Sequence, residues 1–100
     1  MPSMYARGRA FEYKVRDKLE ELGFAVFRIA GSKPIDLIAL SQRGEVFLIE
    51  CKKGGHITKR EVDEMQEFAK KYKANYIVVT PEGLKNLPAI LQRTPDPTPL

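Results

Sequence analysis

Residues 36–52 read DLIALSQRGEVFLIECK, and most of the expected architecture follows from this segment. Two apolar runs, 36–40 and 46–52, flank a short polar segment that contains Gly44. Short apolar runs bounded by turn residues are typical of β-strands, and two of them joined this closely predict a hairpin. Both runs are almost continuously apolar, so we expect helices to cover both faces of the sheet that contains them.

The segments on either side of the hairpin supply helices. Apolar residues at helical spacing predict a helix over about residues 4–22, followed by a strand at 24–30. After the hairpin, Thr58 with Glu61 three residues on has the form of a capping box, which predicts that a second helix begins there. The expected buried stripes are Ala10 or Phe11, Val15, Leu19 and Leu22 on the first helix, and Val62, Met65, Phe68, Ala69 and Tyr72 on the second.

These elements predict a single α/β domain with the order α-β-β-β-α-β. The last strand is expected at 75–80, and residues 81–91 are expected to hold one more helical turn. Three consecutive strands followed by a helix and another strand favour one central mixed β-sheet flanked by helices. We expect the domain to span 1–92 and the proline-rich residues 93–100 to form a disordered tail.

The composition is that of a small soluble domain that suits an anionic partner. The chain has 100 residues and a formal net charge of +4, which is compatible with nucleic acid without identifying it. Its single cysteine, Cys51, excludes an intrachain disulfide, and one histidine leaves no Cys and His cluster for zinc. No apolar run approaches the roughly 18 residues of a spanning helix, and the N-terminus does not resemble a signal peptide. We therefore expect a cytoplasmic protein without a membrane partner.

The hairpin is expected to bring two carboxylates and an ammonium group together. If its loop is centred on Arg43, paired positions sum to 86, and Asp36 then lies directly opposite Glu50. Lys52 shares the face of Glu50, whereas Cys51 faces the opposite side and is expected to pack there. Two adjacent carboxylates repel each other unless a cation lies between them. Mg²⁺ is typically held by one or two carboxylates with waters and substrate phosphates, so this edge is a candidate metal site.

Such a site would serve phosphodiester hydrolysis. A bound divalent ion polarises the phosphate and lowers the pKa of a bound water, and Lys52 would stabilise the developing charge or orient the water. The alternative is a solvated acidic edge whose ion pair contributes little. Asp36 and Glu50 stand at the ends of strands expected to be covered on both faces, where carboxylates are unfavourable unless they are paired or bind metal. This position favours the functional interpretation.

The motifs around these residues resemble those of archaeal-type Holliday junction resolvases. Asp36 with Glu50-x-Lys52 is similar to the PD-(D/E)xK nuclease signature, although Ile35 replaces the proline and Pro34 stands one place earlier. The wider match covers about residues 5–80 and comprises Arg7-Gly8-x-x-Phe11-Glu12, Leu22-Gly23-Phe24-Ala25-Val26-x-Arg28, Ala30-Gly31-Ser32-Lys33-x-x-Asp36-Leu37-Ile38-Ala39 and Ile49-Glu50-x-Lys52.

The resemblance implies a restriction-endonuclease-like fold and a homodimeric endonuclease that resolves four-way DNA junctions by paired symmetrical nicks. It implies that three carboxylates bind Mg²⁺, for which Mn²⁺ can substitute, and it implies no small-molecule cofactor. The implied metal ligands are Glu12, Asp36 and Glu50, and the implied catalytic residues are these three with Ser32 and Lys52. The resemblance also places Phe68 and Tyr72 at the dimer interface, with ordinary core packing as the alternative for this pair.

Basic residues flank the site in sequence and are candidates for phosphate contacts, which supply most non-specific DNA affinity. The resemblance assigns Arg7 and Arg28 to this role. Lys59 and Arg60 oppose the helix dipole at a helix N-terminus, which is easier to explain if they meet phosphate. The full set of candidates is Arg7, Arg9, Arg28, Lys33, Lys53, Lys59 and Arg60, with a solvated basic face as the alternative for each.

Three features depart from the family pattern. Tyr13 stands where a basic residue usually follows the helix glutamate, the segment between Lys52 and the second helix is short, and the chain ends early. Other functions stay open at this point. They are a PD-(D/E)xK nuclease that acts on flaps, ends or damaged duplex, a catalytically inactive DNA-binding module, and an unrelated α/β protein with a solvated acidic edge.

Overall fold

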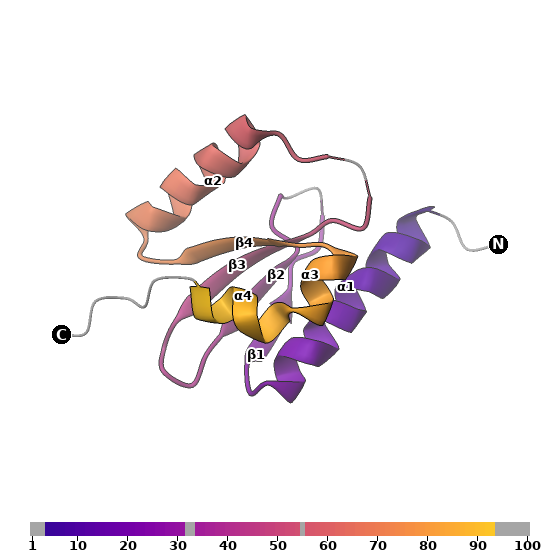
Figure 1. Ribbon diagram of the computed structural model, residues 1–100, viewed down its shortest axis with the longest axis horizontal. Coiled ribbons are helices and arrows are strands. Elements are labelled where there is room, and N and C mark those ends of the chain that lie inside the picture. Colours follow the sequence, from indigo (N-terminus) through magenta and orange to yellow (C-terminus); the bar gives the residue numbers. More distant parts are fainter. Residues whose placement is uncertain (1–3, 32–33, 55, 94–100) are drawn as a thin grey trace.

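The structure is a computed structural model that describes residues 4–31, 34–54 and 56–93. Its helices and strands occur in the expected order, with two short helices added at the end (Figure 1). The elements are α1 (Met4–Glu21), β1 (Ala25–Arg28), β2 (Leu37–Leu40), β3 (Val46–Cys51), α2 (Lys59–Lys71), β4 (Asn75–Val79), α3 (Pro81–Lys85) and α4 (Leu87–Arg93).

The four strands form one mixed sheet in the order β1-β2-β3-β4, as predicted. The first three strands are antiparallel neighbours, and β4 runs parallel to β3. Helix α2 lies between β3 and β4 in the sequence and supplies the long connection that a parallel pair requires. The hairpin pairs Leu37 with Ile49 and Leu40 with Val46, so the predicted register holds over these four pairs.

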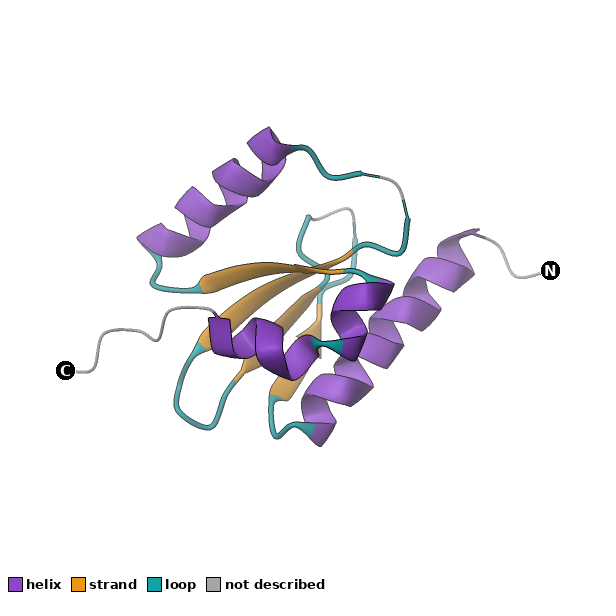
Figure 2. Ribbon diagram, in the orientation of Figure 1, coloured by secondary structure: helices purple, strands orange, loops and turns teal. Residues whose placement is uncertain are grey.

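Helices cover both faces of this sheet, which agrees with the continuous apolar runs of β2 and β3. Helix α2 packs on one face, and α1, α3 and α4 lie on the other (Figure 2). On the α1 face the larger core gathers Phe11, Val15 and Leu19. Phe11 is the buried alternative at the start of this stripe, because Ala10 is exposed. Leu22 is 38% exposed, so its predicted burial was wrong.

Helix α2 begins where the capping box predicted, but its buried stripe is narrower than predicted. The Thr58 hydroxyl accepts a hydrogen bond from the Glu61 N–H at 3.1 Å. Only Ala69 is buried on the helix, with Val62 and Met65 half-buried beside it. The predicted burial of two aromatic residues was wrong, because they lie on one flank of that stripe: the exposed fractions are 49% for Phe68 and 62% for Tyr72.

The C-terminal segment holds two helices where one helical turn was expected. The Thr80 hydroxyl caps α3 by accepting from the Gly83 N–H at 3.1 Å, and Pro81 fills the first helical position. Leu87 on α4 is fully buried against the sheet. Arg93, the first residue of the expected tail, belongs to α4, and 94–100 lie outside the described residues. Within the described part of the chain, no helix is long and apolar enough to cross a membrane.

Candidate active site

Asp36 stands at the end of the sheet where β2 begins and β1, β3 and β4 end. Its carbonyl accepts from the Ile29 N–H at 2.8 Å, which continues the pairing with β1. Its N–H donates to the Ile49 carbonyl at 2.8 Å, although the hairpin already pairs Ile49 with Leu37. Two consecutive residues thus face one, which is the arrangement of a β-bulge, a device that redirects side chains next to active sites. The prediction that Asp36 lies directly opposite Glu50 was therefore wrong by this one step.

At the bulge, the Asp36 side chain accepts a hydrogen bond from the backbone of β3. Its Oδ2 accepts a hydrogen bond from the Cys51 N–H at 2.7 Å. Partial burial raises the pKa of this carboxyl, and the charges of Glu12 and Glu50 raise it further, whereas the Cys51 N–H and Arg28 act in the opposite direction. The carboxylates of Glu12 on α1 and Glu50 on β3 are therefore close enough to Asp36 to influence its pKa.

Glu50 is held by a residue that the sequence analysis did not single out. The Tyr76 hydroxyl donates to Glu50 Oε1 at 2.6 Å. Tyr76 is only 3% exposed, and burial together with this hydrogen bond raises the pKa of its phenol. The parallel pairing of Leu48 with Tyr76 and of Glu50 with Val78 puts Tyr76 two residues before the partner of Glu50, on the same face. Once this register is known, the two-residue spacing identifies Tyr76 as a neighbour of Glu50.

Glu12 reaches the site from α1 and is paired with a predicted DNA contact. The Arg28 Nε donates to Glu12 Oε1 at 3.1 Å, and the side chains are 31% and 18% exposed respectively. The Arg28 guanidinium also lies 5.6 Å from the centre of the Tyr13 ring. Tyr13, which stands where the family usually has a basic residue, thus packs against Arg28.

Lys52 follows β3 directly and is half-buried. Its N–H donates to the Val79 carbonyl at 2.8 Å, which keeps the end of β3 beside β4. Cys51 packs against the core under α1, as predicted, and burial raises the pKa of its thiol. Alternation along the strand puts Lys52 on the face of Glu50.

The remaining predicted residues are spread over the molecule. Lys59 pairs with Asp63 at 3.3 Å and Arg60 with Glu64 at 3.2 Å, both as exposed pairs along α2. Such pairs contribute little to stability. Arg9 is half-buried on α1, and Lys53 is exposed. Ser32 and Lys33 lie outside the described residues, as does the side chain of Arg7.

The donor set suits a hard divalent cation. In the described segments, no three Asp, Glu, His or Cys side chains are gathered tightly enough to hold a metal ion by themselves. Asp36 and Glu50 each use one oxygen for the hydrogen bonds given above, and the other oxygen accepts none from the described residues. Mg²⁺ requires only one or two protein carboxylates when waters and phosphates complete its shell. A cation would also relieve the repulsion that raises the pKa of Asp36.

Comparisons with known proteins point to one family. Residues 3–93 match the family model described as archaeal Holliday junction resolvase (Hjc). The crossover junction endodeoxyribonuclease Hjc of Methanocaldococcus jannaschii is 40% identical over 73 residues, which cover 69% of this chain and 54% of that protein. The chain thus spans about half the length of this curated relative.

Solved structures show the same fold. The Holliday junction resolvase Hjc of Archaeoglobus fulgidus superposes with a TM-score of 0.60 at 28% identity, covering 74% of this chain and 63% of the other. A VRR_NUC domain gives a TM-score of 0.64 at 19% identity, covering 89% of this chain and 98% of the domain. The second likeness concerns the fold alone. Together the two matches confirm the predicted α/β domain with a mixed sheet flanked by helices.

Proposed function

The chain belongs to the archaeal Holliday junction resolvase family, and from that premise we propose that it is a DNA endonuclease that resolves four-way junctions by paired symmetrical nicks. The observation that carries the proposal is the bulged end of the sheet. There Asp36 is fixed by the Cys51 N–H at 2.7 Å and Glu50 by the Tyr76 hydroxyl at 2.6 Å. Each hydrogen bond leaves the second carboxylate oxygen available for a ligand.

The chemistry follows from these side chains. Asp36 and Glu50 would hold Mg²⁺ or Mn²⁺, with Glu12 as the third carboxylate. The bound ion polarises the phosphodiester and lowers the pKa of water at the site. Lys52 supplies a fixed positive charge where negative charge develops on the phosphate. Ser32 belongs to the proposed site through its motif alone.

Paired nicks require two sites related by a two-fold axis, so we propose a homodimer. The pair of exposed aromatic residues on α2 supports this proposal. The ring centres of Phe68 and Tyr72 lie 5.2 Å apart, and large exposed apolar side chains side by side are typical of interaction surfaces. A symmetric contact through this pair would bury both rings.

DNA contacts are proposed for the basic residues named from the sequence, which are Arg7, Arg9, Arg28, Lys33, Lys53, Lys59 and Arg60. The recognition would depend on the shape and backbone of the junction rather than on its bases. Since the proposed substrate is DNA, we propose that the protein acts in the cytoplasm.

The test compares a synthetic four-way junction with a flap and a linear duplex of the same arm sequences, in Mg²⁺ and in Mn²⁺. The expected result is symmetrical nicking of the junction and little cleavage of the other two substrates. Preferential flap cleavage, or equal cleavage of the linear duplex, would replace the resolvase by another nuclease. Binding without cleavage in either metal would leave a DNA-binding module.

A further inference from the structure

A basic depression lies at the end of the sheet that carries the candidate active site. It has a volume of about 260 Å³ and lies between α1, the segment after β3, and α3. Its apolar lining includes Phe11 and Leu84, and its charged lining consists of Lys14, Lys53 and Lys85. Figure 1 shows α3 next to α1 although the two helices stand far apart in the sequence.

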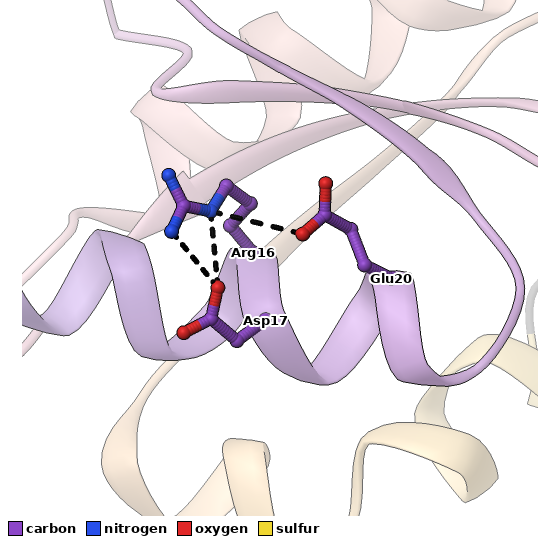
Figure 3. A network of polar contacts seen from close by, with 3 residues as sticks. All are labelled: Arg16, Asp17 and Glu20. Carbon is purple, nitrogen blue, oxygen red and sulfur yellow. Dashed lines mark hydrogen bonds and ion pairs between the residues drawn. The ribbon is translucent and has the colours of Figure 1, made fainter.

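The charges of this depression are one-sided. Within residues 4–31, 34–54 and 56–93, no acidic residue lines it, and no carboxylate forms an ion pair with any of its three lysines. Other cations of α1 are engaged: Arg16 contacts Asp17 at 2.9 Å and Glu20 at 3.9 Å (Figure 3), and Lys18 contacts Glu21 at 4.0 Å. Ammonium groups brought together without counter-charge repel one another, and an anion between them removes that repulsion.

The depression also shares its elements with the active site. Phe11 precedes Glu12 on α1, and Lys53 follows Lys52 at the end of β3. Lys53 and Pro81 stand just after the ends of β3 and β4, so the depression opens at the end of the sheet where Asp36 and Glu50 lie. A DNA strand bound at that end would carry neighbouring phosphates past this surface. The apolar lining suits the aliphatic stems of the lysines, which can lie along it while their ammonium groups face the strand.

We propose that Lys14, Lys53 and Lys85 form a binding site for the sugar-phosphate backbone next to the cleaved phosphate. The proposal rests on the proposed function, since it assumes that DNA reaches the active site. It adds two residues, Lys14 and Lys85, that the sequence pattern did not indicate. The site would contact phosphate on any DNA, because lysine ammonium groups carry no base readout here.

The test measures affinity for a fluorescent four-way junction and for a linear duplex in EDTA, where metal-dependent cleavage cannot occur, over a range of KCl concentrations. The slope of log affinity against log salt is negative, and each lost phosphate contact makes it less steep by about 0.9. We expect Lys14→Gln with Lys85→Gln to reduce the magnitude of the slope by about 1.8 on both DNAs. Lys18→Gln, one turn along the same helix, is the matched control and should leave the slope unchanged. All three lysines are at the surface, so melting curves should coincide with that of the wild type.

The outcomes separate the two claims. An unchanged slope in the double variant, or an equal loss in the control, would overturn the phosphate site while leaving the resolvase intact. A wild type that binds linear duplex as well as junction, with the lysine-dependent slope retained, would support the site and count against junction selectivity. A wild type that binds neither DNA would overturn both.

Discussion

Asp36 combines two tasks in one side chain. It replaces a backbone acceptor at the bulge by taking the Cys51 N–H, and it presents its second oxygen at the site. Burial and neighbouring carboxylates raise its pKa, so its ionised form is less stable in the folded chain than in the unfolded one. Functional sites commonly hold charged groups whose ionised form is destabilised in this way, and a bound cation would stabilise that form.

The first prediction concerns Asp36→Asn without metal. At neutral pH the variant should melt at a higher temperature than the wild type, because the amide removes a partly buried charge and its oxygen can still accept from Cys51. A raised folded-state pKa means that the wild type gains stability as pH falls through that pKa towards the ordinary value near 3.8. The advantage of the variant should therefore shrink on acidification, as thermal melts across this range would show. A variant less stable at neutral pH would contradict this account.

The second prediction concerns the hydrogen bond from Tyr76 to Glu50. Tyr76→Phe keeps the buried ring but frees the carboxylate to rotate, and loss of a partner that orients a ligand typically weakens metal affinity about 10–100-fold. Calorimetric titration of the DNA-free protein with Mn²⁺ measures this directly. Tyr72→Phe is the matched control, since its ring is 62% exposed. Equal affinities in both variants would show that Tyr76 does not position Glu50.

Among single residues, the sequence named Glu12, Asp36, Glu50 and Lys52 as candidates for the site but did not predict the residues that contact them. Strand alternation predicts which face a side chain takes, and it was right for Cys51. It has no means of detecting an inserted residue, so the bulge was missed. Tyr76 was missed because its place beside Glu50 follows from the parallel register between β3 and β4, which the sequence analysis did not predict.

At the scale of elements, the spacing of apolar residues predicted α1 and α2 correctly. It did not show which apolar residues of each helix are buried against the sheet. Ala69 meets the sheet, while Phe68 and Tyr72 on the flank of the same helix stay exposed. The helices after β4 were under-predicted, although Thr80 with Pro81 is a cap followed by a favoured first residue. Leu87 is buried by residues of α1 and of the sheet that are distant in the sequence, so its burial could not be predicted from the local pattern.

The third prediction follows from that exposed pair. Phe68→Ala with Tyr72→Ala should convert a dimer into a monomer in sedimentation or light scattering. The unfolding free energy of the isolated subunit should change little, because neither ring is packed in the core. Met65→Ala is the contrasting control, because Met65 is one turn away on α2 and half-buried against the sheet. This variant should lower the free energy of unfolding by about 2 kcal/mol or more and leave the dimer intact. A wild type that is monomeric at all concentrations would contradict the proposed interface.

At the scale of the whole molecule, one small sheet carries the site at one end and helices on both faces. Each chain has one such end, so the proposed resolution of a junction would need two chains acting on opposite strands. The α/β class, the mixed sheet and the hairpin register were all predictable from 100 residues, because both strands of the hairpin read as covered on two faces. The homodimer, with Phe68 and Tyr72 at its interface, stays a prediction.

The fourth prediction depends on each chain having a single active site. When wild-type and Asp36→Asn subunits are mixed and allowed to exchange, dimers with a single active site should nick one strand and leave the junction joined. Native gels would then show nicked but unresolved junctions that increase with the share of variant subunits. Resolution that falls only in proportion to the wild-type share, without a nicked species, would show that the two sites do not belong to one dimer.

The most direct test of the central claim is cleavage of a synthetic four-way junction in Mg²⁺ by the wild type, Asp36→Asn and Glu50→Gln. The account predicts paired symmetrical nicks by the wild type, and loss of cleavage with retained junction binding in both variants. Cleavage that persists in either variant would contradict the assignment of the reaction to the bulged end of the sheet.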